Sequence, residues 1–330
     1  MSTVTAPPSE IVVTTTSRPQ PRIGPRRRTL PGLYMELTKA RLSALVLMTT
    51  AVGFIVASFD DINWTRMLWT MLGTALCAAS ANAFNQIIEI RRDAKMNRTR
   101  NRPLPAGRLR VPTSFVVAMA MGYLGVGMLA ILVNLAAATL ALITILTYVL
   151  LYTPLKPRST LNTLVGAVCG AIPPMIGWVA VTNRLDPGAW ALAAILFVWQ
   201  IPHFLALAWL YRDDYARGGF AMLPAIDRDG RLTGQVILVS CLMTLSVALG
   251  VTVFRVAGPF YAIGATLIGL WWLILCVRLH LNRSNVNARW VFVGSLIYLP
   301  VILCLMVCDR GSAPWRSPDV HTLTASEATK

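Results

Sequence analysis

The chain has 330 residues, of which 55% are hydrophobic and only 13% are charged, and its formal net charge is +16. Soluble domains carry about 25% charged residues, so this composition excludes an ordinary water-soluble domain as well as a disordered chain. The long apolar runs instead predict one polytopic membrane domain. The basic excess raises nucleic acid as a partner, but in a membrane protein it has first to be tested as topology.

Nine apolar runs approach the roughly 20 residues that a membrane-spanning helix needs. They are Leu42–Phe59, Met67–Ile88, Pro112–Val133, Leu135–Tyr152, Leu161–Thr182, Ala189–Leu210, Gln235–Phe254, Pro259–Val277 and Trp290–Cys308. We therefore expect an all-α protein with nine transmembrane helices. In the fifth run, Pro173 and Pro174 predict a kink or a break, and Gly166 and Gly170 form a GxxxG pattern that suits close helix packing.

The distribution of basic residues predicts the orientation. If the N-terminus lies inside, 24 of the 30 Lys and Arg residues fall on the inner side and 6 on the outer side. This is the positive-inside pattern, so the charge needs no nucleic acid to explain it. We expect a multi-pass protein of the cell inner (cytoplasmic) membrane with a cytosolic N-terminus; a mitochondrial inner membrane is the alternative.

The apolar runs and the charge pattern divide the chain into three segments. Residues 1–34 are rich in Thr, Ser, Pro and Arg and lack the apolar core of a secretory signal, so we expect a disordered cytosolic tail. Residues 35–308 form the membrane domain. Residues 309–330 form a short extracytoplasmic tail.

The end of the second run carries a polar face. Asn85, Glu89 and Asp93 are spaced i, i+4, i+8, so on a helix they share one face over roughly 12 Å. Acids at this depth are costly unless they are paired or bind a cation. Oxygen ligands on one face suit Mg²⁺, which takes one or two carboxylates together with phosphate oxygens. The alternative, a helix end with solvated charges, accounts for Asp93 alone.

A dense basic cluster follows this face. It contains Lys95, Arg98, Arg100, Arg102 and Arg108. Arg binds phosphate through two hydrogen bonds at once, although inner-side charge or lipid headgroup binding would also use these residues. Acids and bases at one membrane depth favour a magnesium–diphosphate site.

The loop after the sixth run supplies a second acid–base cluster that includes Arg212, Asp214 and Arg217. Facing the first cluster, it could bind a second Mg²⁺ or the same diphosphate. Lys156, at the same side of the membrane, is either part of this site or an interface anchor.

A histidine lies within the sixth run. His203 follows Pro202, which frees backbone groups, and an ionisable residue inside a span is a functional candidate. The alternative is a His that is hydrogen-bonded to a neighbouring helix.

These motifs resemble those of the intramembrane UbiA-type prenyltransferases, and within that family the branch that modifies haem. The stretches that carry the resemblance are Asn85–Pro105, Tyr152–Lys156, Asn162–Trp178, Trp199–Phe204 and Asp214–Pro224, and it covers roughly residues 35–305. The resemblance implies nine helices around a central cavity, with Mg²⁺ as cofactor. It implies transfer of farnesyl from farnesyl diphosphate to the 2-vinyl group of haem B, with addition of water, giving haem O for haem-copper oxidases.

The resemblance also implies roles for individual residues. Asn85, Glu89, Asp93 and Asp214 would bind Mg²⁺, and these residues with Lys156 would be catalytic. The diphosphate would be bound by Arg92, Lys95, Arg98, Arg102, Lys156 and Arg212. Haem would contact His203, Trp199 and Tyr152. The second acidic motif of the family usually has two acids four apart, but Gly218 stands four residues after Asp214, which leaves the number of Mg²⁺ ions open.

Two other functions stay open at this point. A UbiA-type enzyme with an aromatic quinone precursor as acceptor would share the diphosphate site. A transporter would use Glu89 and Asp93 as an ion site. The expected partners are farnesyl diphosphate, haem B and membrane lipid, with haem A synthase or oxidase assembly proteins as further candidates and no nucleic acid.

Overall fold

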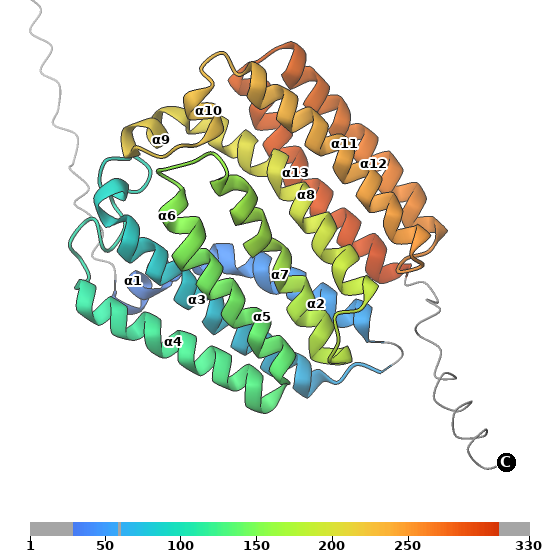
Figure 1. The fold of residues 1–330 in the computed structure, drawn as a ribbon, viewed down its shortest axis with the longest axis horizontal. Helices are drawn as coiled ribbons and strands as arrows, with labels where there is room; N and C mark the ends of the chain where they lie inside the picture. The colour runs from blue at the N-terminus through green and yellow to red at the C-terminus, as the bar shows by residue number, and fades with distance from the viewer. Residues whose placement is uncertain (1–28, 59–60, 310–330) are drawn as a thin grey trace, which may run out of the picture.

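A computed structural model describes residues 29–58 and 61–309, and the regular elements of these ranges are all helices (Figure 1). In chain order they are α1 (Leu30–Leu37), α2 (Ala40–Ala57), α3 (Trp64–Asp93), α4 (Val111–Leu132), α5 (Leu135–Leu146), the π-helix η1 (Thr147–Tyr152), α6 (Thr153–Leu155), α7 (Asn162–Thr182), α8 (Pro187–Leu210), α9 (Arg212–Gly218), α10 (Leu223–Ile226), α11 (Arg231–Val253), α12 (Pro259–Leu281) and α13 (Asn285–Cys308).

The all-α prediction is confirmed, and each predicted apolar run corresponds to a helix. Eight helical stretches in the described residues are long and apolar enough to cross a membrane, with α5, η1 and α6 together forming one of them. The first run corresponds to α2, in which Ser43–Ala57 is a shorter apolar helix. Its predicted end, Phe59, lies outside the described residues.

Two local predictions are changed by the structure. Of the kink or break predicted for the fifth run, the break is excluded, because α7 continues from Asn162 to Thr182 with Pro173 and Pro174 inside it. Packing against neighbouring helices holds such a segment helical although each Pro removes one backbone hydrogen bond. The boundary of the predicted tail is also too late, because residues 30–34 belong to α1, where Leu33 is buried. The rest of both predicted tails lies outside the described residues.

The helices α7 and α8 form the centre of the molecule. In each of them 72% of the apolar window is buried, against 17% in α4, which presents apolar side chains outward. Helix α2 lies against α7 through glycine: a Cβ atom at Gly53 would collide with the backbone of Pro174, and one at Gly177 with the backbone of Thr50. Small residues allow this close approach of two backbones in a membrane protein.

The two glycines of the GxxxG pattern, unlike Gly53 and Gly177, contact side chains and not the backbone of another helix. A Cβ atom at Gly166 would meet the ring of Tyr152, and one at Gly170 would meet the side chain of Gln200. These glycines therefore make room for polar and aromatic side chains, whereas the backbone contact of α7 is made by Gly177.

The long polar loops gather at one end of the helices (Figure 1). The loop after α3 and the segment containing α9 and α10 lie there together, and the Ala221 backbone N–H donates to the Lys156 carbonyl at 2.7 Å. At the opposite end, Asn134 Nδ2 donates to the Val179 carbonyl at 2.7 Å. The segments predicted to share the inner side therefore do share one end of the fold.

We expect Gly177→Ala to destabilise the protein strongly, because the new methyl group would overlap the Thr50 carbonyl and force α2 away from α7. The matched control is Gly127→Ala in α4, where a Cβ atom meets nothing within 4 Å. Thermal unfolding of the purified variants in detergent measures both. Equal melting temperatures would contradict the proposed close packing.

Candidate functional site

The polar face of α3 is buried in the protein. Asn85 and Asp93 have no exposed surface, and Glu89 is 4% exposed. The sequence spacing placed these three side chains on one face, and the structure confirms that they share it. Burial of two carboxylates is costly unless each has a partner.

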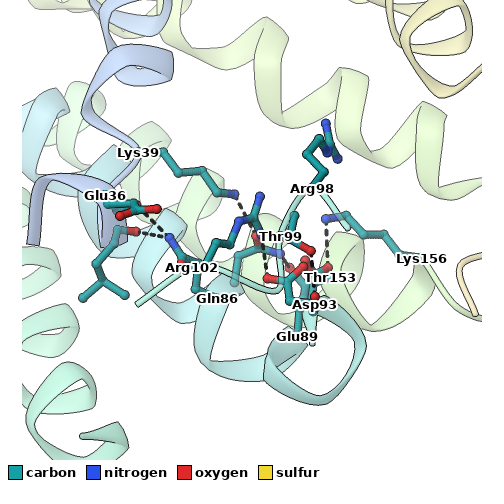
Figure 2. Close-up of polar contacts among 12 residues, drawn as sticks. Glu36, Lys39, Gln86, Glu89, Asp93, Arg98, Thr99, Arg102, Thr153 and Lys156 are labelled. Carbon is teal, nitrogen blue, oxygen red and sulfur yellow. Dashed lines mark hydrogen bonds and ion pairs between the residues drawn. The ribbon is translucent and has the colours of Figure 1, made fainter. Parts of the chain in front are cut away.

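Each of the three side chains has a basic partner from a different segment, and Figure 2 labels these partners, Lys39, Arg102 and Lys156. The pairs are Lys39 Nζ with Asn85 Oδ1 at 2.9 Å, Lys156 Nζ with Glu89 Oε1 at 2.8 Å, and Arg102 Nη1 with Asp93 Oδ2 at 2.6 Å. The segments are the junction of α1 and α2, the end of α6, and the loop after α3. A ring of cations therefore surrounds the polar face of α3.

Neighbouring contacts fix this arrangement. Asn85 Nδ2 donates to Thr153 Oγ1 at 3.2 Å, and Thr153 Oγ1 donates to the Tyr148 carbonyl at 2.8 Å. Thr153 follows the π-helix η1, an element that often occurs at functional sites. Gln86 Nε2 donates to the carbonyls of Glu36 and Leu37 at 2.9 and 2.8 Å. Helix α3 thus binds the backbone just before the lysine that reaches its polar face.

Lys39 is the site residue that the sequence analysis missed. It stands directly before an apolar run, a position typical of a membrane-interface anchor. Its backbone is left-handed, with φ of 50°, a conformation that costs energy for a residue with a Cβ atom and that occurs at functional sites. Burial, the nearby Arg102 and the nearby Lys156 lower its pKa to about 7. The amine of Lys39 is therefore a buried group that lies near two other basic side chains.

Lys156 carries the opposite shift. Its burial opposes the charged form, but the charge and hydrogen bond of Glu89 outweigh burial and raise its pKa. Its ammonium also lies 4.5 Å from the centre of the Tyr152 ring. This places Tyr152, which was assigned to haem, beside the predicted diphosphate-binding lysine.

One of the two carboxylate oxygens of Asp93 has no partner. This oxygen, Oδ1, is buried and has no hydrogen-bond partner among the described residues. The described ranges contain no group of three or more His, Cys, Asp or Glu side chains that could hold a metal by themselves. A cation bound here would thus need the Asn85 amide oxygen and ligand oxygens from a substrate.

Asp214 has other partners than the three α3 residues. It is 8% exposed, and its carboxylate accepts the backbone N–H groups of Asn97 and Arg98, each at 3.1 Å, as well as the guanidinium of Arg217. Burial would raise its pKa, but these donors outweigh burial and lower it. Asp214 therefore joins α9 to the loop after α3.

The remaining predicted diphosphate ligands are spread over this second cluster. Arg92 donates to the Gly219 carbonyl at 2.9 Å, and the Arg98 guanidinium lies 4.7 Å from the Tyr211 ring centre. Arg212 lies over the Trp209 ring, and Lys95 is exposed. In the described part of the chain none of these four forms an ion pair with Glu89 or Asp93, unlike Lys156 and Arg102.

His203 lies in a buried aromatic cluster between α8 and α13. Its ring stacks on Trp199 with 4.8 Å between centres and lies 5.0 Å from the Phe292 ring. Its Nδ1 is 2.7 Å from Ser295 Oγ. Ser295 Oγ donates to the Phe292 carbonyl at 2.5 Å, so it accepts from His203. The histidine proton is thereby held on Nδ1, and Nε2 keeps its lone pair.

We expect Lys156→Met to cost about 3 kcal/mol of stability, because it leaves Glu89 buried without a partner. Adding Glu89→Gln should recover most of the loss, since no charge then remains to be compensated. Thermal unfolding of the two single variants and the double variant measures this coupling. Arg158→Met, at an exposed position, is the control; additive losses would contradict a buried ion pair.

Comparison with known proteins agrees with this architecture. Residues 46–299 match the model of the UbiA prenyltransferase family. The chain is 41% identical over 286 residues to a protoheme IX farnesyltransferase of Solibacter usitatus, covering 84% of this chain and 98% of that protein. It is 40% identical over 284 residues to the human mitochondrial protoheme IX farnesyltransferase, covering 86% of this chain and 63% of that protein.

Solved structures show the same fold at low identity. A UbiA homologue from Archaeoglobus fulgidus bound to DMAPP and Mg²⁺ superposes with a TM-score of 0.62 at 15% identity, over 83% of this chain and 98% of that one. A digeranylgeranylglyceryl phosphate synthase gives a TM-score of 0.71 at 16% identity, over 84% of this chain and 97% of that one.

Proposed function

The chain belongs to the UbiA prenyltransferase family, and we propose that it transfers the farnesyl group of farnesyl diphosphate to the 2-vinyl group of haem B. Water adds in the same reaction, and the products are haem O and diphosphate. The observation that supports a diphosphate substrate is the buried face of Asn85, Glu89 and Asp93, which is surrounded by basic side chains. Haem as the acceptor is supported by relatives named protoheme IX farnesyltransferase.

The α3 face fits Mg²⁺. Its donors are the amide and carboxylate oxygens of Asn85, Glu89 and Asp93, and Asp93 Oδ1 is buried without a hydrogen-bond partner among the described residues. Two carboxylates and one amide leave room for phosphate oxygens, as Mg²⁺ prefers. A bound Mg²⁺ would supply charge neutralisation for the leaving diphosphate. Relatives of the same fold have been solved with Mg²⁺ and a prenyl diphosphate.

The three basic partners have a direct role in this proposal. Lys39, Arg102 and Lys156 now neutralise the α3 face, and their long side chains can turn to the phosphate oxygens when the face binds a cation. Their positive charge then stabilises the charge that grows on the leaving group as the allylic C–O bond breaks. Surplus positive charge around Lys39 favours an anionic ligand.

The acceptor end of the reaction involves the aromatic cluster of α8 and α13. Trp199 and Phe292 flank His203 and offer a flat, apolar environment that suits a porphyrin ring. With its proton held on Nδ1 by Ser295, His203 presents the Nε2 lone pair to an iron or a proton. The vinyl carbon of haem forms the new C–C bond with farnesyl. Water then adds to the neighbouring carbon and releases a proton.

The basic residues also indicate the membrane and the orientation of the chain. We propose the cell inner membrane with the N-terminus and the loops of the site in the cytosol, because most basic residues fall on that side. A mitochondrial inner membrane is the alternative, since relatives occur in bacteria and in mitochondria. Proteins that use haem O, such as haem A synthase or oxidase assembly factors, are candidate partners.

The first test is product analysis. Membranes that contain the protein are incubated with haem B, farnesyl diphosphate and Mg²⁺, and the haems are identified by mass. We expect haem O, and we expect it to vanish with EDTA. Prenylation of an aromatic acid without haem O would move the assignment to a quinone precursor. Farnesyl transfer to neither acceptor would contradict the proposal.

The α3 face is tested with isosteric variants. We expect Glu89→Gln and Asp93→Asn to lower turnover by at least 100-fold, because each removes a charged oxygen ligand. Asp229→Asn, an exposed acid at the same end of the fold, should retain normal turnover. Near-normal rates in folded Glu89→Gln or Asp93→Asn protein would refute the metal assignment.

The aromatic cluster is tested through Ser295. Without its hydroxyl, Ser295→Ala no longer holds the His203 proton on Nδ1, so we expect the KM for haem to rise roughly three- to tenfold, with an unchanged KM for farnesyl diphosphate. Ser246→Ala, at an exposed hydroxyl of α11, is the control. A shifted Soret band of bound haem in Ser295→Ala would report the changed histidine directly. Equal rises in both KM values would argue against a haem-specific role.

A further inference from the structure

Asp214 connects two segments that are more than 100 residues apart. Its carboxylate accepts from the Asn97 and Arg98 backbone N–H groups and from the Arg217 guanidinium. Hydrogen bonds between a buried carboxylate and backbone amides are strong, because one partner is charged. The contact fixes the path of the chain at residues 97–98.

Further contacts join the same two segments, and we call residues 92–98 together with 211–220 the clasp. Arg92 Nη1 donates to the carbonyls of Gly218 and Gly219 at 3.2 and 2.9 Å. Arg98 Nη2 donates to Tyr215 Oη at 3.1 Å. Met96 is buried in a hydrophobic cluster with Phe220. The clasp is thus a built interface, with Asp214 as its buried charge.

The clasp determines where the next residues of the loop go. Directly after it, Thr99 Oγ1 donates to the Asp93 carbonyl at 2.9 Å. Three residues further on, Arg102 reaches the Asp93 carboxylate at 2.6 Å. The fixed backbone at residues 97–98 therefore positions Arg102 beside the α3 face.

The same contacts compete with metal binding at Asp214. Its negative charge is already balanced by Arg217, and both of its oxygens accept hydrogen bonds. A cation would have to displace Arg217 and release the loop. Asp93, in contrast, keeps one buried oxygen without a partner in the described part of the chain.

We propose that Asp214 is a positioning residue that holds the loop of residues 94–110 over the α3 face, and that this site binds one Mg²⁺ ion. Asp214 is accordingly not a metal ligand, in contrast to the role that the family resemblance implied for it. The count of one metal ion rests on the proposed function; the role as loop anchor does not.

Limited trypsin digestion of the purified protein in detergent tests the anchor. In Asp214→Asn, an amide nitrogen, which cannot accept a hydrogen bond, replaces one carboxylate oxygen. The loop should then open more often, and cleavage after the exposed Arg100 should be about tenfold faster. Asp213→Asn, at the exposed neighbouring acid, should be cleaved at the wild-type rate. Asp214→Glu, which keeps the carboxylate, should be cleaved at an intermediate rate and serves if Asp214→Asn does not fold. Equal cleavage rates in all these proteins would overturn the anchor role.

Mn²⁺ binding, counted by electron paramagnetic resonance in the presence of farnesyl diphosphate, tests the metal count. We expect one Mn²⁺ per chain in the wild type and in Asp214→Asn, with about a tenfold higher KM for farnesyl diphosphate in the variant. Two Mn²⁺ ions in the wild type and one in Asp214→Asn would make Asp214 a metal ligand. Absence of bound Mn²⁺ in the wild type would overturn the proposed metal site, while the digestion still decides the anchor role.

Discussion

Two buried carboxylates at the end of a membrane helix are the constraint on which the rest of the site depends. Glu89 and Asp93 cannot stay charged in a buried position without cations. The protein meets this requirement with Lys156 and Arg102, and adds Lys39 at the neighbouring amide. Each cation comes from a different segment. The α1–α2 junction, the end of α6 and the loop after α3 therefore meet at this face of α3.

In the proposed function, the cations around the α3 face have a second role. The cations that balance the carboxylates are the ones that a diphosphate would need. Burial first, and then the nearby Arg102 and Lys156, lower the pKa of Lys39. In the proposed function, cation binding at the α3 face would release these three basic side chains. The π-helix η1 and the left-handed backbone at Lys39 are local costs that the surrounding packing supports.

The spacing of residues predicted one part of the site but not the contacts of Lys39 and Asp214. The i, i+4, i+8 spacing predicted the face of Asn85, Glu89 and Asp93, because helical periodicity is local. Lys39 carried no such signal, since a basic residue before an apolar run serves equally well as an interface anchor. Asp214 was predicted to share the role of Asp93, but its partners are the backbone amides of Asn97 and Arg98. Amides of a distant loop leave no trace in side-chain spacing.

Hydropathy, helical period and charge bias act within about 20 residues. The amino-acid sequence is therefore enough to predict the membrane class, the helices and the end of the fold where the polar motifs gather. Three features became visible only in the folded protein: which cation pairs with which oxygen, the unbroken course of α7 through two prolines, and the Ser295 hydroxyl that holds the His203 proton on Nδ1. These outcomes depend on how helices pack and how loops close, and they join residues that are far apart along the chain.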